Sequence, residues 1–552
     1  MMKTLANITL VSFAAVSFAL GTQVGPRFSA HAESAKPTPT PRVLPSGRPA
    51  GVIPVPTPLP TPISPATPIP RVQTLEELQS KIQARVFSPE VRRGRVGVKI
   101  VSHKTGKVIF ENDSDKYFMP ASNMKNFTVA AALERLGPDF RFVTSVYAAA
   151  MPDATGTIQG DLRIFGRGDI SISTAFTGVD YYKGLDNLAD KIIAAGVKRV
   201  EGGIIGDDTH FKGFAIPGTW EWDDLQWYYG AEISALPLND NAVDLAVTPG
   251  SPGGPCIVMI SPANSLMQIT NLCTTAASSV KRDLRVFKKL DRNSLEISGM
   301  MPVDDGGMKR SVAFTRPAEL FVALLKQRLE AKGVTVKGGA RILPPNIKPE
   351  TQAEIARLES APFSLIAAKT MKPSQNMYTE TILWTLGEYA RSRTSYPTVG
   401  GVSGGALDSS ELGIGEVKSF LSGIGVPSDG IRQYDGSGLS RHDLITPSAV
   451  ITLYDYMSKR SRYSQAWRDS LTIGGIDGTL SNRFKGTAAA GNIRGKTGTI
   501  DQVSALSGYV KTAGGEELII SLLVNGVAET RQRTALIDEI VVNLANFNGR
   551  ID

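Results

Sequence analysis

In the first and last thirds of this 552-residue chain, hydrophobic residues occur in two patterns: at helical spacing and in short continuous runs. Apolar residues three or four positions apart predict helices over 75–87, 121–136 and 530–547. Short apolar runs bounded by turn residues predict strands over 96–102, 107–111, 503–510 and 517–525. Both ends of the chain therefore combine helices with strands.

The middle of the chain has a different pattern. Strand-like segments such as 162–165, 204–205 and 284–287 alternate with occasional helices, among them 317–331. Long helical patterns return after about residue 363. We therefore expect an α+β fold in which one domain, 74–143 and 363–552, is interrupted by a large, mostly β insert, 144–362, that forms one or two extra domains.

The first 73 residues are predicted to lie outside the folded domains. Residues 1–32 have the features of a signal peptide: Lys3, a short apolar core, and small residues at Ala30 and Ala32. An uncleaved anchor is the alternative, although the apolar run is short for a membrane span. Thirteen of the 34 prolines fall within 33–73, and proline removes backbone N–H donors, which predicts a disordered linker.

Composition narrows the possible functions. The net charge of +8 is spread along the chain and accompanies no nucleic-acid motif, so we expect no nucleic-acid partner. The four histidines lack metal-ligand spacing, so neither a metal nor another cofactor is expected. Cys256 and Cys273, the only cysteines, would form a disulfide in an exported protein or remain two buried thiols.

Three motifs carry the candidate chemistry: Ser122-Asn123-Met124-Lys125, Ser374-Gln375-Asn376 and Lys496-Thr497-Gly498. In this order they resemble the S-x-x-K, S-x-N and K-T-G set of serine acyl-transfer enzymes that react with penicillin. A serine hydroxyl attacks a carbonyl only when a base takes its proton. Lys125 lies one helical turn from Ser122 and is the candidate base.

The second and third motifs complete the expected site. Ser374 would relay a proton to the leaving amine, and Asn376 would hold both Lys125 and the substrate amide. A helix N-cap is the alternative interpretation of this pair.

A strand carrying Lys496 and Thr497 would line the cleft, with the lysine facing a substrate carboxylate. Gly498 would let the substrate backbone approach closely. The N–H groups of Ser122 and Thr499 would form the oxyanion hole.

Each motif type has a competing match elsewhere. A second S-x-x-K, Ser278 to Lys281, lies in a polar stretch without an apolar helix behind it. A second K-T-G, Lys104 to Gly106, falls between two predicted strands and indicates a hairpin turn. Gly401 to Gly405 fits a G-x-S-x-G nucleophile elbow, but the polar, proline-broken segment before it does not predict the strand that an elbow needs.

Further segments extend the resemblance. They are Met119-Pro120-Ala121 before Ser122, Asp435-Gly436-Ser437-Gly438-Leu439-Ser440-Arg441, Asp477-Gly478-Thr479-Leu480, Gly206-Asp207-Asp208-Thr209 and Tyr229-Gly230-Ala231-Glu232-Ile233-Ser234-Ala235-Leu236. With the three motifs they make residues 75–550 resemble the low-molecular-mass class C penicillin-binding proteins, which are D-alanyl-D-alanine carboxypeptidases and endopeptidases.

The resemblance implies a penicilloyl-serine transferase fold, an antiparallel sheet flanked by helices. It implies cleavage of D-Ala-D-Ala bonds in peptidoglycan stem peptides through an acyl-serine, acylation by β-lactams, and a location in the periplasm or on the outer face of the cytoplasmic membrane. By position, Asp224, Tyr229 and Arg441 would recognise the free amino end of the peptide side chain. A β-lactamase and a non-catalytic envelope scaffolding protein are the alternatives.

Overall fold

The computed structural model describes residues 71–344, 347, 352–393 and 407–551. The predicted signal peptide, nearly all of the predicted linker and the Gly401–Gly405 segment lie outside these residues. None of the described helices combines the length and apolarity needed to cross a membrane.

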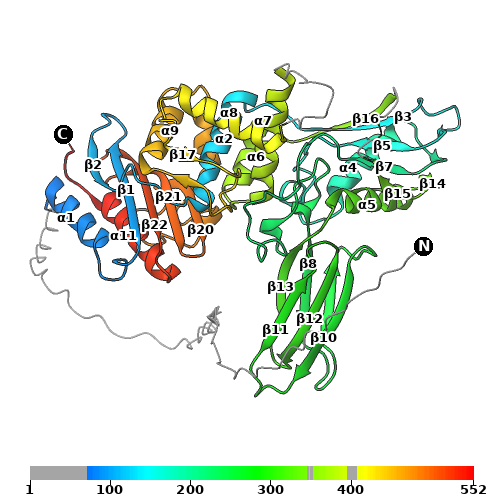
Figure 1. Ribbon diagram of the computed structural model, residues 1–552, viewed down its shortest axis with the longest axis horizontal. Coiled ribbons are helices and arrows are strands. Elements are labelled where there is room, and N and C mark those ends of the chain that lie inside the picture. The colour runs from blue at the N-terminus through cyan, green and yellow to red at the C-terminus, as the bar shows by residue number, and fades with distance from the viewer. Residues whose placement is uncertain (1–70, 345–346, 348–351, 394–406, 552) are drawn as a thin grey trace, which may run out of the picture. The chain divides into compact units, whose positions relative to one another are not determined.

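A six-stranded antiparallel sheet forms the centre of the part built from the two ends of the chain (Figure 1). Its strands, in spatial order, are β19 (Thr472–Ile473), β20 (Arg494–Ile500), β21 (Val503–Lys511), β22 (Glu517–Asn525), β1 (Arg95–Ser102) and β2 (Val108–Asn112). Strand β22 is buried along nearly its whole length. Both faces of the sheet are therefore covered.

Helices cover the two faces of this sheet. On one face lie α1 (Leu75–Val86) and α11 (Thr530–Asn546), whose apolar residues share a core with Ile520 and Leu522 of β22. Alternate residues of the same strand, Ile519 and Leu523, point into the core of the opposite face. The helices of that face are α2 (Lys125–Leu136), α6 (Phe363–Met371), α7 (Asn376–Arg393), α8 (Ser409–Gly423), α9 (Pro447–Lys459) and α10 (Ser464–Ser470).

The middle of the chain folds around a mixed five-stranded sheet. Its order is β15 (Ala340–Ile342), β7 (Ile204–Asp207), β5 (Leu162–Phe165), β3 (Val143–Ala148) and β16 (Ala353–Glu359). Its core includes residues of α4 (Lys183–Ala194) and α5 (Pro317–Ala331). The entering strand β3 pairs antiparallel with the leaving strand β16, and Val143 lies opposite Glu359. The predicted ends of the insert lie beside this strand pair.

Smaller sheets complete the middle of the chain. They are β13 (Met308–Ala313) with β8 (Ala242–Thr248) and β9 (Ile257–Ser261), β10 (Gln268–Ala276) with β12 (Ser294–Pro302) and β11 (Asp283–Lys288), and β14 (Thr335–Val336) with β6 (Arg199–Val200) and β4 (Thr157–Ile158). A disulfide joins Cys256 to Cys273, which are 17 positions apart.

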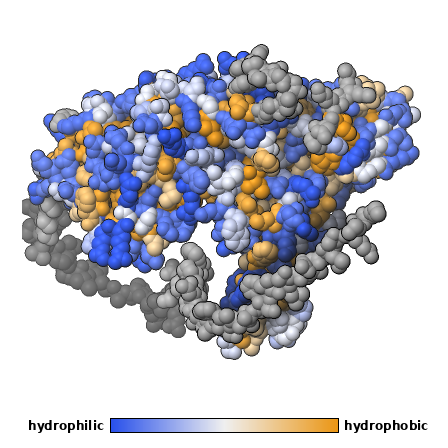
Figure 2. All heavy atoms as spheres, viewed as in Figure 1, coloured by the Kyte–Doolittle hydropathy of each residue, from blue (hydrophilic) through white to orange (hydrophobic). Residues whose placement is uncertain are grey.

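The remaining elements are short. They are the helix α3 (Thr174–Thr177), the 3-10 turns η1 (Ala121–Met124), η2 (Tyr228–Gly230), η3 (Asn239–Asn241) and η4 (Gly478–Leu480), and the strand pair β17 (Ile431–Arg432) and β18 (Leu444–Ile445). Figure 2 shows hydrophilic residues over most of the visible face, with hydrophobic residues in scattered groups.

The predicted elements agree closely with the observed ones. Helix α5 and strands β5 and β22 have the predicted ends, and the other predicted elements shift by one or a few residues. The main difference is at 121–136, where a 3-10 turn precedes the α-helix. Ala121 has a φ of 46° there, because the chain turns sharply before Ser122.

Two glycines let separate segments meet at this turn. A Cβ on Gly498 would lie 2.5 Å from the carbonyl oxygen of Pro120. A Cβ on Gly438, whose φ is 78°, would lie 1.8 Å from the carbonyl oxygen of Ala121. Strand β20 and the 435–441 segment therefore pack directly against η1, and only glycine fits at these two contacts.

We expect Gly438→Ala to lower the free energy of unfolding by about 2 kcal/mol or more, because it combines a clash with a left-handed backbone. Gly415→Ala is the matched control, since Gly415 lies in α8 with open space around it and should be neutral or stabilised by up to about 1 kcal/mol. Urea unfolding of both full-length variants measures the difference. Equal stability of the two variants would contradict the close contact.

Candidate active site

Lys125 is the meeting point of the first two motifs. Its Nζ lies 2.9 Å from Ser122 Oγ, 2.6 Å from Asn376 Oδ1 and 2.8 Å from the backbone carbonyl oxygen of Ser437. A neutral amine has two hydrogens and one lone pair. The two carbonyl oxygens accept both hydrogens, which leaves the lone pair for the Ser122 hydroxyl.

Burial makes this neutral form accessible. The Lys125 side chain is fully buried, and this lowers its pKa to about 7. The carboxyl groups of Asp435, Glu380 and Asp443 act in the opposite direction, since negative charge favours the ammonium form. Near neutral pH the Lys125 amine can therefore either take up or release a proton.

The third motif forms a second lysine site. Lys496 lies on β20, and its Nζ donates to Ser374 Oγ at 2.8 Å and to the carbonyl oxygen of Thr497 at 2.9 Å. Burial lowers the pKa of Lys496 well below its usual range, and the neighbouring Lys125 lowers it further. The two lysines thus link all three motifs.

Ser374 is held in an unusual backbone conformation. Its φ is 68°, in the left-handed region that few non-glycine residues occupy. The next backbone N–H, of Gln375, donates to the carbonyl oxygen of Thr370 at 2.9 Å, and α7 begins at Asn376. This turn brings the Ser374 hydroxyl to Lys496 and the Asn376 amide to Lys125. The strained backbone at Ser374 thus places both side chains at the site.

The rest of the K-T-G segment is anchored to the Ser122 turn. Asn123 Nδ2 donates to the carbonyl oxygen of Lys496 at 3.0 Å. The hydroxyl oxygens of Thr497 and Thr479 are 2.6 Å apart. Thr499, two positions further on, is exposed. The Thr499 hydroxyl donates to the backbone carbonyl oxygen of Gly498 at 2.8 Å. The strand is therefore tied to the Ser122 turn through Asn123 and presents an exposed threonine near its end.

A buried acidic group beneath Lys125 had no role in the sequence interpretation. Glu380 accepts the backbone N–H groups of Gly436 and Ser437 at 2.7–3.0 Å, and Asp435 accepts those of Gly438 and Ser440 at 2.6 and 2.8 Å. These bonds fix the loop whose Ser437 carbonyl contacts Lys125.

Burial, reinforced by the charge of Asp435, raises the pKa of Glu380 to about 8. Glu380 lies among buried residues in the first half of α7, and an acidic residue within the stretch 377–387, which has no other charged residue, was the signal that could have found it.

The insert contributes two contacts to this site. Trp220 Nε1 donates to Asp435 Oδ2 at 2.8 Å, and Asn376 Nδ2 donates to the backbone carbonyl oxygen of Tyr229 at 2.9 Å. Asn376 contacts Lys125 directly, and Asp435 fixes the loop whose Ser437 carbonyl contacts Lys125. The insert is therefore part of the framework of the site.

Asp224 and Tyr229 lie together at the insert side of the site. Half-burial raises the pKa of Asp224 to about 6, with Asp223 and Glu221 adding to the effect, while a hydrogen bond with the Tyr229 side chain opposes it. Arg441 lowers the pKa of Asp224 through its charge, but its own ion pair is with Glu221, at 2.8 Å. Asp224 is thus a partly desolvated acid rather than a freely solvated one.

The second S-x-x-K and K-T-G matches lie in loops, outside the group of residues around Lys125. Ser278 to Lys281 lies in the exposed connection between β10 and β11. Lys104 to Gly106 forms the turn between β1 and β2, with Gly106 at a φ of 75°. The Gly401–Gly405 segment is outside the described residues.

Known proteins match this chain over most of its length. The D-Ala-D-Ala carboxypeptidase 3 (S13) family matches residues 78–547. A D-alanyl-D-alanine carboxypeptidase of Actinomadura sp. (strain R39) is 34% identical over 486 residues, which are 86% of each chain.

Penicillin binding protein 4 (dacB) from Haemophilus influenzae has a similar solved structure, with a TM-score of 0.71 and 22% identity over 87% of this chain and 100% of that one. A structure of the same protein complexed with a β-lactam has a TM-score of 0.65 at 22% identity, over 86% and 98% of the two chains.

The structural similarity confirms the predicted fold class, a penicilloyl-serine transferase domain with additional β domains. The family match and the 34% identical relative identify the chemistry class. This protein belongs to the D-Ala-D-Ala carboxypeptidase 3 (S13) family of serine-type hydrolases, the low-molecular-mass class C penicillin-binding proteins.

Proposed function

We propose that the protein cleaves D-Ala-D-Ala bonds of peptidoglycan stem peptides through an acyl-enzyme on Ser122, as a carboxypeptidase, a D,D-endopeptidase or both. The supporting observation is the 2.9 Å contact between Ser122 Oγ and the Nζ of a fully buried Lys125. A buried amine with two fixed acceptors is suited to take the serine proton.

Acylation begins when Lys125 Nζ takes the proton of Ser122. The Ser122 oxygen bonds to the carbonyl carbon of the penultimate D-Ala, and the tetrahedral oxyanion faces the N–H groups of Ser122 and Thr499. The C–N bond then breaks. The leaving amine receives a proton through the Ser374 hydroxyl, which Lys496 contacts at 2.8 Å.

Substrate binding is expected to change the charge of Lys496. The terminal carboxylate of the peptide would lie near Lys496, with Thr497 and Thr499 beside it. A nearby negative charge favours the ammonium form, so the depressed pKa of Lys496 would rise when the carboxylate binds. The expected role of Gly498 changes, because the Ser122 turn fills the space where its Cβ would lie, so the glycine serves that contact rather than the approach of the substrate backbone. Water then hydrolyses the acyl-serine, with Lys125 as base, whereas a β-lactam leaves a slowly hydrolysed adduct.

Incubation with benzylpenicillin should add one penicilloyl group to the wild-type chain and none to Ser122→Ala, as measured by intact mass over several hours. Ser278→Ala is the matched control and should be labelled like wild type, because Ser278 lies in an exposed loop. Rapid loss of the adduct with antibiotic turnover would favour a β-lactamase. A folded wild-type protein without any adduct would favour the scaffolding alternative.

The rate of acylation should depend on pH through Lys125. Only the neutral amine accepts the Ser122 proton, and its pKa is about 7. The second-order rate constant for benzylpenicillin should therefore fall about tenfold per pH unit below 7 and level off above it. Stopped-flow acylation between pH 5 and 9 measures this profile. A rate that keeps rising tenfold per pH unit up to pH 9 would show that the pKa of Lys125 is not lowered to about 7.

We propose that Asp224, Tyr229 and Arg441 bind the free amino end of the stem-peptide side chain. The support is the position of Asp224 beside Tyr229 and the charge of Arg441 near it. The carboxylate would pair with an ammonium group above a pH of about 6, where Asp224 is ionised.

Asp224→Asn should raise KM about tenfold for a stem peptide with a free side-chain amine and leave KM unchanged for the Nε-acetylated peptide, because one charge-assisted hydrogen bond is lost. Steady-state release of D-alanine from both peptides measures this. Asp223→Asn is the control, since Asp223 is an exposed neighbour. Equal effects on both peptides would exclude recognition of the amine.

We also propose that the protein acts outside the cytoplasmic membrane, in the periplasm or on the outer face of that membrane. The support is the signal-like sequence of residues 1–32 together with a substrate class that is found in the cell wall.

A further inference from the structure

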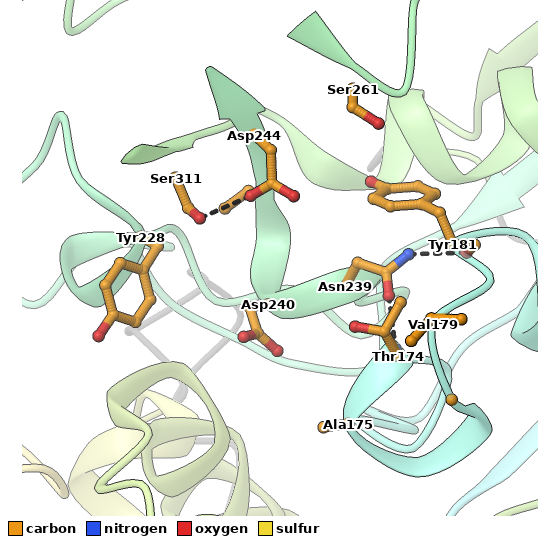
Figure 3. Close-up of a pocket in the computed structure, with 12 residues that line it drawn as sticks. Thr174, Ala175, Val179, Tyr181, Tyr228, Asn239, Asp240, Asp244, Ser261 and Ser311 are labelled. Atoms are coloured by element: carbon orange, nitrogen blue, oxygen red, sulfur yellow. Dashed lines mark hydrogen bonds between the residues drawn. The ribbon is translucent and has the colours of Figure 1, made fainter. Parts of the chain in front are cut away.

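A separate cavity of about 600 Å³ lies in the insert (Figure 3). Its wall comes from α3 and the residues after it, from Tyr228 of η2, from η3, and from the β13-β8-β9 sheet. None of the residues assigned to catalysis or to Asp224 recognition lines it. The chemistry above therefore does not account for this cavity.

The sheet presents a row of polar groups to the cavity. Asp244 of β8 lies opposite Ser311 of β13 and opposite Ser261 of β9, so the three side chains share one face at one register position. Ser311 Oγ donates to Asp244 Oδ1 at 2.7 Å. The second carboxylate oxygen of Asp244 points toward the open space (Figure 3).

A second carboxylate faces the same cavity. Asp240 of η3 has a φ of 63° and accepts a hydrogen bond from Tyr378 Oη at 2.5 Å. Tyr378 lies on α7, two positions after Asn376. Asp240 thus joins the cavity to the beginning of the helix that carries the second catalytic motif.

A buried tyrosine hydroxyl lies at the cavity. Tyr181 lines the cavity, and its ring extends toward Asp244 with the hydroxyl at the near end (Figure 3). That hydroxyl is buried and has no hydrogen-bond partner among the described residues. A buried polar group without a partner costs free energy, which a ligand with a hydrogen-bond donor or acceptor at this position would recover.

We propose that this cavity binds the primary ammonium group of an aliphatic ligand, between Asp240, Asp244 and the Tyr181 hydroxyl. Two carboxylates match the positive charge, and the hydroxyl oxygen accepts one of its N–H groups. The rings of Tyr181 and Tyr228 supply apolar and cation–π surface for the attached carbon chain.

The donor set favours an organic cation over a metal ion. Among the described residues, no group of three or more His, Cys, Asp or Glu side chains could hold a metal. A metal ion needs no aromatic rings around it. The cavity volume of about 600 Å³ is also much larger than an ion, and suits an organic ligand.

Cadaverine, a five-carbon diamine, is the probe. We titrate it into the full-length Asp224→Asn protein, so that amine binding beside Tyr229 does not contribute, and follow it by saturation-transfer difference NMR. The proposal expects saturable binding that Asp244→Asn weakens at least about fivefold and Tyr181→Phe about twofold or more. Asp291→Asn, at an exposed acid elsewhere in the insert, should have no effect.

Glutarate, which has the same chain length and the opposite charge, should not bind. Asp244 is exposed, so its substitution should leave the fold intact, and circular dichroism checks this. Unchanged cadaverine affinity in Asp244→Asn, or no binding up to 10 mM in the parent protein, would overturn the proposal. Displacement of cadaverine by 1 mM MgCl₂ at constant ionic strength would overturn it in favour of a metal site.

Discussion

The candidate active site depends on removing the Lys125 amine from water while leaving it fully hydrogen-bonded. Its three neighbours, Ser122, Asn376 and the Ser437 carbonyl, satisfy the ammonium form and, when the serine donates instead, the neutral form as well. Neither protonation state leaves an unpaired group. Burial then sets the balance between them near neutrality.

Several parts of the fold hold the groups that surround the Lys125 amine. The carbonyl of Ser437 is held because Glu380 and Asp435 bind the N–H groups of its loop, and Asp435 is in turn held by Trp220. Gly438 and Gly498 allow the loop and the strand to approach the Ser122 turn. Charge, backbone geometry and close packing all position one nitrogen atom.

The sequence predicted the regular elements well, and the structure brings the side chains of the three predicted motifs together. Helix α5 was found because Pro317 begins an apolar periodic run, and β22 because apolar residues fill a segment bounded by turns. The Ser437 carbonyl could not be found, since a backbone oxygen has no sequence signal. The alignment of Asp244 with Ser261 and Ser311 depends on the register between distant strands, which local patterns do not encode.

The hydrogen bonds from Trp220 to Asp435 and from Asn376 to the Tyr229 carbonyl restrict how this chain could become shorter during evolution. Strands β3 and β16 lie side by side, so a deletion between them could rejoin the backbone with little distortion. Such a deletion would nevertheless expose Asp435 and remove a partner of Asn376. A shortened descendant would have to evolve new partners for both before its loss of the insert became tolerable.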